Sequence, residues 1–265
     1  MKRSHGGFTL IELILVILVL AIVSTSITSF VQHGIGIYQD TAGRDKQISD
    51  SRFVIERITS EIREALPNSV RVTADGQCVE FIPILDSSSY VDIPVLPDGA
   101  SNTVTVVVSD RNVTDNAAKI VVYPSTTADV YAASNALSGV VFDVASYGTV
   151  TANVRDITLD NTVLFNDDSP TARYFIIKDS VAYCQGGDNT IKRYQGHALT
   201  PIQASPPSGV GVMGILMAER QTNSAPFTLL SATLMRNAMV QMDFSFQYSD
   251  ESLRLINEVH ITNVP

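Results

Sequence analysis

The pattern of apolar and polar residues divides the chain close to its start. Residues 8–31 are apolar or small and hydroxylated apart from one charged residue, Glu12, and they follow a short polar leader with Lys2 and Arg3. A helix over these residues is ~36 Å long at ~1.5 Å per residue, and a bilayer core is ~30 Å thick. The pattern predicts a leader over 1–7 and a membrane-spanning helix over 8–31, with the basic leader on the cytoplasmic side.

Beyond the apolar run the pattern becomes amphipathic. Isoleucines recur at helical spacings on one face, at Ile48, Ile55, Ile58 and Ile62. Glycine weakens a helix interior by about 1 kcal/mol relative to alanine, so Gly34, Gly36 and Gly43 are soft points. Pro67 disfavours a helical residue before it and ends the element. We therefore expect one helix from Phe8 to about Leu66, with residues 32–66 as the amphipathic continuation.

The remainder of the chain, residues 67–265, is predicted to be a β-rich domain. From Val240 to Tyr248 every second residue is apolar or aromatic, which is typical of an antiparallel sheet with one buried face. Turn-rich segments separate the other apolar or β-branched runs, and the turn Gln185–Asn189 between Ser180–Cys184 and Thr190–Tyr194 predicts a hairpin. The predicted strands are Val70–Thr73, Cys78–Leu85, Thr103–Ser109, Lys119–Tyr123, Val140–Val144, Val154–Leu159, Arg173–Ile177, Ser180–Cys184, Thr190–Tyr194, Phe227–Leu234, Val240–Tyr248 and Leu253–Thr262.

Polar, Pro- and Gly-rich segments are predicted as loops. They are Asp86–Ser89, Pro94–Asn102, Asp110–Ala118, Pro201–Gly214 and the turn Ser249–Ser252. The fold class is α+β, with a long N-terminal helix packed on antiparallel β-sheets. We expect two β-lobes, a long insertion around Asp86–Asn135, and the helix lying across one sheet.

Charge restricts the class of partner. The chain has 18 basic and 27 acidic residues, and loss of Lys2 and Arg3 with the leader leaves 16 against 27, a net charge of −11. An acidic surface of this kind argues against binding nucleic acid, whose affinity for proteins comes largely from basic contacts to phosphates. Lys192 and Arg193 form too small a basic pair to reverse this, and we interpret them as solvated.

Two cysteines, Cys78 and Cys184, lie on the oxidising side of the membrane in this topology. A bond between them would close a loop of about 107 residues, which the chain-entropy description values at roughly 4–5 kcal/mol. The sequence leaves a disulfide and two buried free thiols as equal alternatives.

Candidate chemistry elsewhere is sparse. The four histidines, His5, His33, His197 and His260, form no Cys/His metal spacing, and we expect His197 in a loop and His260 on a strand surface. Asp167-Asp168 and Asp188-Asn189 offer oxygen atoms to a hard cation without a defined ligand spacing. Phosphate-binding loops and nucleophile motifs are absent from the sequence. We therefore predict no enzyme activity, no cofactor and no metal site.

Glu12 is the residue that membrane insertion does not explain, since a carboxylate within a spanning helix is costly. The string Gly6-Gly7-Phe8-Thr9-Leu10-Ile11-Glu12, followed by an unbroken apolar run, resembles the processing site of type IV pilins and type II secretion pseudopilins. An ordinary secretory signal is the alternative. It would require small residues at a cut after the apolar run, and Ser24-Thr25-Ser26 provides only a weak version of them.

The resemblance implies that prepilin peptidase cleaves between Gly7 and Phe8 and that Phe8 is then N-methylated. The apolar helix is kept, and Glu12 of one subunit neutralises the Phe8 amine of a neighbour during assembly. Implied partners are other major and minor pilins, prepilin peptidase and the inner membrane. The implied location is the inner membrane, with a single pass and the C-terminal domain in the periplasm, and the pilus after assembly.

Two further stretches resemble a narrower group. The segment from Arg52 to Val72, including Ala65-Leu66-Pro67-Asn68-Ser69-Val70-Arg71-Val72, and the terminal Asn257–Pro265 look like MshO-type minor pilins of the mannose-sensitive haemagglutinin (MSHA) pilus. These are related to the J-type pseudopilins. The resemblance implies a minor pilin that primes or caps an MSHA-type pilus. A J-type minor pseudopilin of type II secretion and a tip adhesin are the alternatives.

Overall fold

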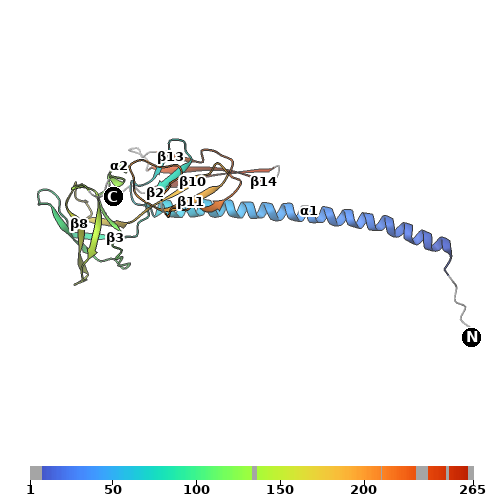
Figure 1. Cartoon of the computed structure of the whole chain (residues 1–265), viewed down its shortest axis with the longest axis horizontal. Coiled ribbons are helices and arrows are strands. Elements are labelled where there is room, and N and C mark those ends of the chain that lie inside the picture. The colour runs from blue at the N-terminus through green and yellow to red at the C-terminus, as the bar shows by residue number, and fades with distance from the viewer. Residues whose placement is uncertain (1–7, 133–135, 210, 231–237, 249–250, 262–265) are drawn as a thin grey trace, which may run out of the picture. The chain divides into compact units, whose positions relative to one another are not determined.

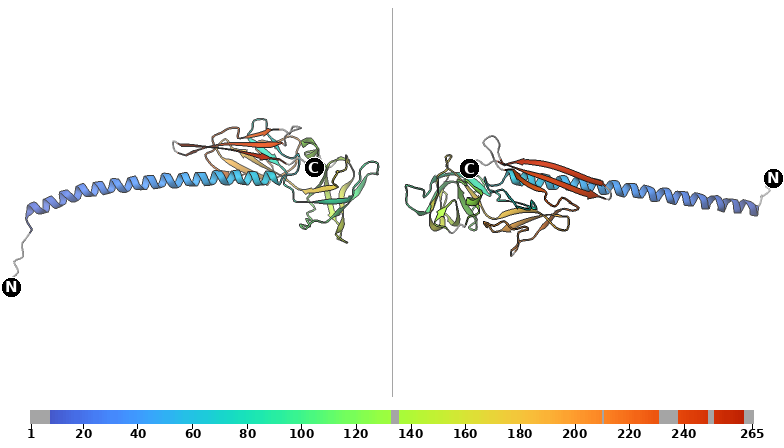
Figure 2. Two further views of the ribbon diagram at one scale, coloured as in Figure 1. Left: turned by 180° about the vertical axis from the view of Figure 1, so that it is seen from behind. Right: turned by 90° about the horizontal axis from the view of Figure 1, so that it is seen from above.

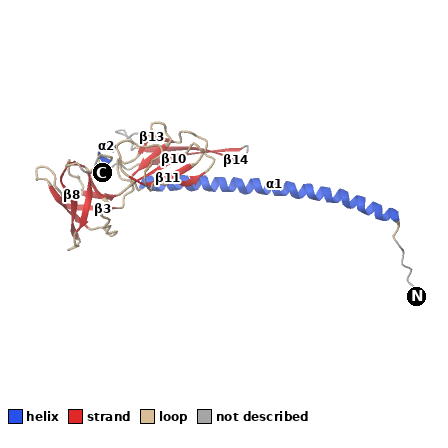
Figure 3. Ribbon diagram, viewed as in Figure 1, coloured by secondary structure: helices blue, strands red, loops and turns tan. Residues whose placement is uncertain are grey.

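The computed structural model describes residues 8–132, 136–209, 211–230, 238–248 and 251–261. It divides into two units, Met1–Ser49 and Asp50–Pro265. Helix α1 (Leu10–Arg63) begins in the first unit and ends in the second, whose other described elements are β-strands and one short helix (Figures 1 and 3). The predicted α+β fold, a long N-terminal helix followed by antiparallel sheets, is confirmed.

Fifteen strands and one short helix follow α1 in the described part of the chain. In chain order they are β1 (Arg71–Val72), β2 (Cys78–Phe81), β3 (Asp86–Asp92), β4 (Ser101–Val107), β5 (Lys119–Val122), α2 (Thr127–Val130), β6 (Ser138–Gly139), β7 (Val141–Tyr147), β8 (Val154–Phe165), β9 (Arg173–Ile177), β10 (Ser180–Gln185), β11 (Ile191–His197), β12 (Ile215–Ala218), β13 (Phe227–Leu230), β14 (Met239–Tyr248) and β15 (Glu251–His260).

Helix α1 has two kinds of surface. Its described residues up to Ser49 are exposed or half-buried, and the helix continues without a break through the three predicted soft glycines. From residue 50 onward one face is buried, at Ser51, Val54, Ile55, Ile58 and Ile62. The helix ends at Arg63, before the predicted end near Leu66, because the Leu66 amide donates to the Ile82 carbonyl oxygen at 2.8 Å.

The buried helix face packs against two sheets, not the single sheet that was expected. We call residues 50–81 and 180–261 the helix-bound lobe. One sheet has the order β1-β2-β10-β11-β12 and the other has the order β13-β14-β15. Both lie beside the C-terminal part of α1 (Figure 2), and all three elements contribute to one core. The predicted hairpin of β10 and β11 is confirmed, and every second residue of β14 from Val240 to Phe246 is buried as its alternation predicts.

Six strands between residues 86 and 177 form a closed antiparallel ring, which we call the barrel. Its order is β3-β4-β8-β7-β5-β9 and back to β3, because β4 pairs with both β3 and β8. Short β6 joins β8 in parallel. Aliphatic side chains fill the barrel core around Phe142 and Phe165, whose rings meet edge to face at 4.8 Å.

The barrel is inserted between β2 and β10 of the helix-bound lobe. Asp86 at its first strand pairs with Ile176 at its last, so the chain enters and leaves the barrel at neighbouring positions. The insertion predicted around Asp86–Asn135 is too short, because the ring is completed only by β9.

The first residues of β3 and the strand β12 also differ from the sequence-based expectation, as do the unpredicted short elements α2 and β6. The predicted loop Asp86–Ser89 is the start of β3, where the buried Asp86 carboxylate accepts hydrogen bonds from the Ser87 amide at 2.8 Å and the Ser109 hydroxyl at 2.6 Å. These bonds let a polar run form a strand of the ring. Ile215–Ala218 was not predicted as a strand; it follows a Pro- and Gly-rich stretch and pairs only with β11 among the described strands.

Candidate processing and assembly site

Thr9 begins the helix at the predicted site. Its Oγ1 accepts a hydrogen bond from the Glu12 amide at 3.4 Å, and its carbonyl oxygen accepts one from the Leu13 amide at 3.2 Å. Thr9 is therefore an N-cap residue, which typically contributes about 1 kcal/mol to a helix. We did not predict this role, although Thr9 and Glu12 have the Thr-x-x-Glu spacing of a capping box.

Glu12 lies in the first turn of α1 with its side chain exposed. A carboxylate at this position is favoured by the partial positive charge of the helix N-terminus. Phe8 lies just before the cap and is 80% exposed. Gly7, on the other side of the predicted cut, lies with the rest of the leader outside the described residues.

The stretch that follows Glu12 is long and apolar enough to cross a membrane. Its hydroxyl groups bond within the helix: Thr25 and Ser26 donate to the Ile22 carbonyl oxygen, and Thr28 donates to that of Ser24. Such back-bonding satisfies the hydroxyls where water is absent. The helix continues through the small residues at which an ordinary signal would be cut.

Cys78 on β2 and Cys184 on β10 are joined in a disulfide, with an S–S distance of 2.03 Å. They are direct partners in the antiparallel register, and their Cα atoms are 4.2 Å apart. Both side chains are buried. All the barrel strands lie between β2 and β10 along the chain, so no local sequence pattern shows that these two strands pair. This is why the sequence alone did not decide between a disulfide and two free thiols.

A buried ionic cluster lies in the same sheet, around Glu80 on β2. Its carboxylate is 2.9 Å from Nη2 of Arg71 and 3.3 Å from Nε2 of His197. Burial raises the pKa of Glu80, but the hydrogen bond from His197 and the charge of Arg71 outweigh it, so the pKa lies below its ordinary value. The predicted loop position of His197 is wrong: it is buried at the end of β11.

The cluster extends to Tyr131, which lies in the segment between β5 and β6. The Arg71 guanidinium lies 3.5 Å from the centroid of the Tyr131 ring, and the Tyr131 hydroxyl donates to the Ser69 carbonyl oxygen at 2.8 Å. Tyr131 follows α2 and is almost fully buried, and this burial raises its pKa well above the ordinary value. These contacts indicate that the cluster stabilises the fold.

The other candidate groups are dispersed. Within the described residues no group of three or more His, Cys, Asp or Glu side chains could hold a metal ion. Asp188 bonds to Lys192 and Thr190 instead, which lowers its pKa to about 2. Arg193, predicted as solvated, is half-buried and bonds to Glu61 of α1 at 3.0 Å. His33 and His260 are exposed.

Comparison with known proteins identifies one feature of the chain. Residues 2–28 match the prokaryotic N-terminal methylation motif. No curated protein and no solved structure matches the chain. The match covers the leader, the Thr9 cap, Glu12 and most of the apolar run, and such a motif implies processing by prepilin peptidase and assembly with other pilins. The chain thus carries, in residues 2–28, the prepilin signal of type IV pilin-like proteins.

Proposed function

We propose that this protein is a minor type IV pilin that primes or caps assembly of an MSHA-type pilus, with a structural rather than an enzymatic role. The observation that carries the proposal is the methylation motif at residues 2–28, placed at the start of a helix able to span a membrane. The resemblance of Ala65–Val72 and of the C-terminal residues to MshO-type pilins supports this assignment over a J-type pseudopilin or a tip adhesin.

In this proposal the leader stays in the cytoplasm and the β-domain lies in the periplasm. Prepilin peptidase cuts after Gly7, and the new Phe8 amino group is methylated. An α-amino group has a reference pKa of about 7.7–8.0, so it is largely cationic at neutral pH. Within a bundle of apolar helices, Glu12 of a neighbouring subunit neutralises it. Because a buried charge without a partner costs about 3–5 kcal/mol, the pair fixes the register of the helices.

The Thr9 cap gives Glu12 a second role inside its own chain. The partial positive charge of the helix N-terminus attracts the Glu12 carboxylate, which stabilises the helix by about 0.3–1 kcal/mol at an exposed site, and the Thr9 cap contributes a similar amount. Both terms are smaller than the penalty for an unpaired buried amine. Removing the cap and removing the charge should therefore have separable effects on assembly.

The test is complementation of a strain that lacks the gene, scored by surface pili and by the amount of processed protein in the membrane. Glu12→Val should insert and be cleaved normally but should fail to enter pili, and Glu12→Gln should be intermediate. Thr9→Val is the matched control, because it removes the cap and leaves the charge. Normal piliation by Glu12→Val, or an equal defect in Thr9→Val, would contradict the pairing role.

Processing is tested separately by mass spectrometry of the mature protein. We expect methylated Phe8 at its N-terminus, and full-length protein in the membrane for Gly7→Glu. An N-terminus after Ser24–Ser26 would instead indicate an ordinary secretory signal. The MSHA assignment predicts co-purification with other MSHA-type pilins; recovery with type II secretion pseudopilins would favour the J-type alternative.

A further inference from the structure

The loop between β4 and β5 carries a short pattern that the proposed function does not use. Asn112-Val113-Thr114 has the form Asn-x-Thr, and among the thirteen asparagines of the chain Asn112 alone is followed two positions later by Ser or Thr. This pattern is the acceptor for N-linked glycans when it lies on the surface of an exported protein. An acidic residue, Asp110, stands two positions before the asparagine.

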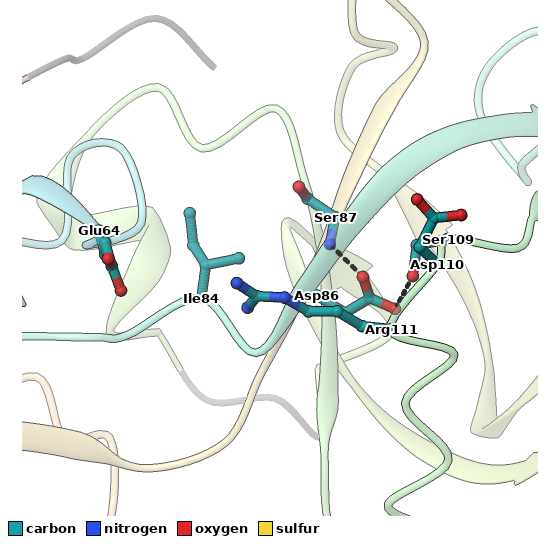
Figure 4. Close-up of a pocket in the computed structure, with 7 residues that line it drawn as sticks. All are labelled: Glu64, Ile84, Asp86, Ser87, Ser109, Asp110 and Arg111. Carbon is teal, nitrogen blue, oxygen red and sulfur yellow. Dashed lines mark hydrogen bonds between the residues drawn. The ribbon is translucent and has the colours of Figure 1, made fainter.

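The pattern lies on an accessible part of the barrel. Asp110, Arg111, Asn112 and Thr114 are all exposed. Asp110 and Arg111 also line an open pocket of about 460 Å³ (Figure 4), together with Glu64, Ile84, Asp86, Ser87 and Ser109. The chain leading to Asn112 is therefore open to solvent on its pocket side, where a modifying enzyme can approach it.

The carboxamide of Asn112 is hydrogen-bonded through its oxygen atom. The Asn112 amide donates to the carbonyl oxygen of Ser109 at 3.2 Å, closing a turn, and its φ is +44°. Its Oδ1 accepts a hydrogen bond of 2.8 Å from Nη1 of Arg155, a buried residue on β8. The carboxamide nitrogen, Nδ2, has no hydrogen-bond partner among the described residues.

A purely structural role accounts for only part of this arrangement. Asparagine tolerates a positive φ, and the bond from Arg155 fixes the turn, so Asn112 could be present for conformation alone. Thr114 has no such explanation, because its exposed side chain forms no hydrogen bond with any described residue. In an acceptor pattern the threonine is needed by the transferase rather than by the fold.

We propose that Asn112 is a site of N-linked glycosylation on the barrel. The co-reactant is a lipid pyrophosphate-linked oligosaccharide, used by a membrane-bound transferase. Nδ2 of Asn112 attacks the anomeric carbon of the first sugar, forming the C–N bond. The bond from that carbon to the phosphate oxygen breaks, and its electron pair leaves with the lipid pyrophosphate. Nδ2 gives up one proton to a base of the transferase. We expect the exposed Asp110 carboxylate to be a further contact for that enzyme.

The proposal rests on the proposed function in one respect only, the placement of the β-domain outside the cytoplasm. The experiment uses full-length protein purified from the membrane and pilus fractions of its native host. Trypsin cuts after Arg111 and Lys119, and the peptide between them holds Asn112 with the matched control Asn116. Fragmentation of this peptide locates any added sugar.

We expect a hexose- or hexosamine-containing mass increment on Asn112, absent from Asn112→Gln and Thr114→Ala. Thr114→Ser and Asn116→Gln should keep it. Thr114→Ala is the decisive variant, since it leaves the Asn112 turn and its bond to Arg155 in place. An unmodified Asn112, or an increment that persists in Thr114→Ala, overturns the proposal. The state of Phe8 in the same sample reports separately on the proposed function, because a missing methyl group there counts against pilin processing alone.

Discussion

Removal of the Cys78–Cys184 bond should reveal whether the helix-bound lobe and the barrel unfold together. The two residues are separated by 106 positions, and the closed loop contains the whole barrel. If the barrel unfolds with the rest, the crosslink restrains a loop of about 107 residues in the unfolded state. The chain-entropy relation then gives about 4.7 kcal/mol of stabilisation at 25 °C.

A barrel that stays folded changes this number. Asp86 and Ile176 are paired, so a folded barrel already holds the two connecting segments together. The flexible loop is then only the stretch from Cys78 to Asp86 and the stretch from Ile176 to Cys184, about 18 residues in all, for which the same relation gives about 3 kcal/mol. The difference of roughly 1.5 kcal/mol distinguishes the two unfolding schemes.

The assay is urea unfolding of a soluble fragment starting near residue 35. Oxidised protein, protein unfolded and refolded with reductant, and Cys78→Ala/Cys184→Ala are compared by circular dichroism. The reduced protein keeps both sulfur atoms, so it separates loss of the crosslink from loss of buried volume. Because both sulfurs are buried, thiols should become reactive only as the protein unfolds. A change below about 1 kcal/mol on reduction would refute the loop argument.

Two further variants test the buried cluster in the same fragment. Because the pKa of Glu80 is lowered in the folded protein, its contribution to the free energy of unfolding is present above the unfolded pKa and is lost as pH falls through the folded pKa. Glu80→Gln should therefore flatten the loss of stability below about pH 4.5. At pH 7 the same variant should lower the free energy of unfolding by about 3–5 kcal/mol, since Arg71 and His197 lose their carboxylate partner. An unchanged acid profile in urea titrations would contradict this. Tyr131→Phe should lower the free energy of unfolding by about 1–3 kcal/mol, because the buried Ser69 carbonyl oxygen loses its donor, and a variant as stable as wild type would show that the bond contributes nothing.

The sequence was most informative where the pattern is local. The helix, the β14 alternation and the β10–β11 hairpin each depend on residues a few positions apart, and all three were predicted close to their observed bounds. The methylation motif is local too. The Thr9 cap is local as well, because the Thr-x-x-Glu spacing to Glu12 lies within four residues of the sequence.

Long-range pairing was not accessible in the same way. Asp86–Ser89 is polar and was predicted as a loop, yet pairing with β9 and the bonds to Asp86 make it a strand. The burial of His197 depends on Glu80, which lies 117 positions earlier in the chain. Neither the closed ring nor the contact between Arg71 and Tyr131 leaves a periodic signal, because each depends on where separate strands meet.

The closed ring bears on how such a protein behaves when crowded. Within the described residues, each of the six ring strands pairs with a ring neighbour on both sides. An exposed strand edge is a template for intermolecular sheet growth and aggregation. Between proteins held side by side at high density in a membrane, the six ring strands offer contacts through side chains alone. Among the described strands, open edges remain at the two-residue β6, which pairs only with β8, and in the helix-bound lobe, where β15 pairs only with β14.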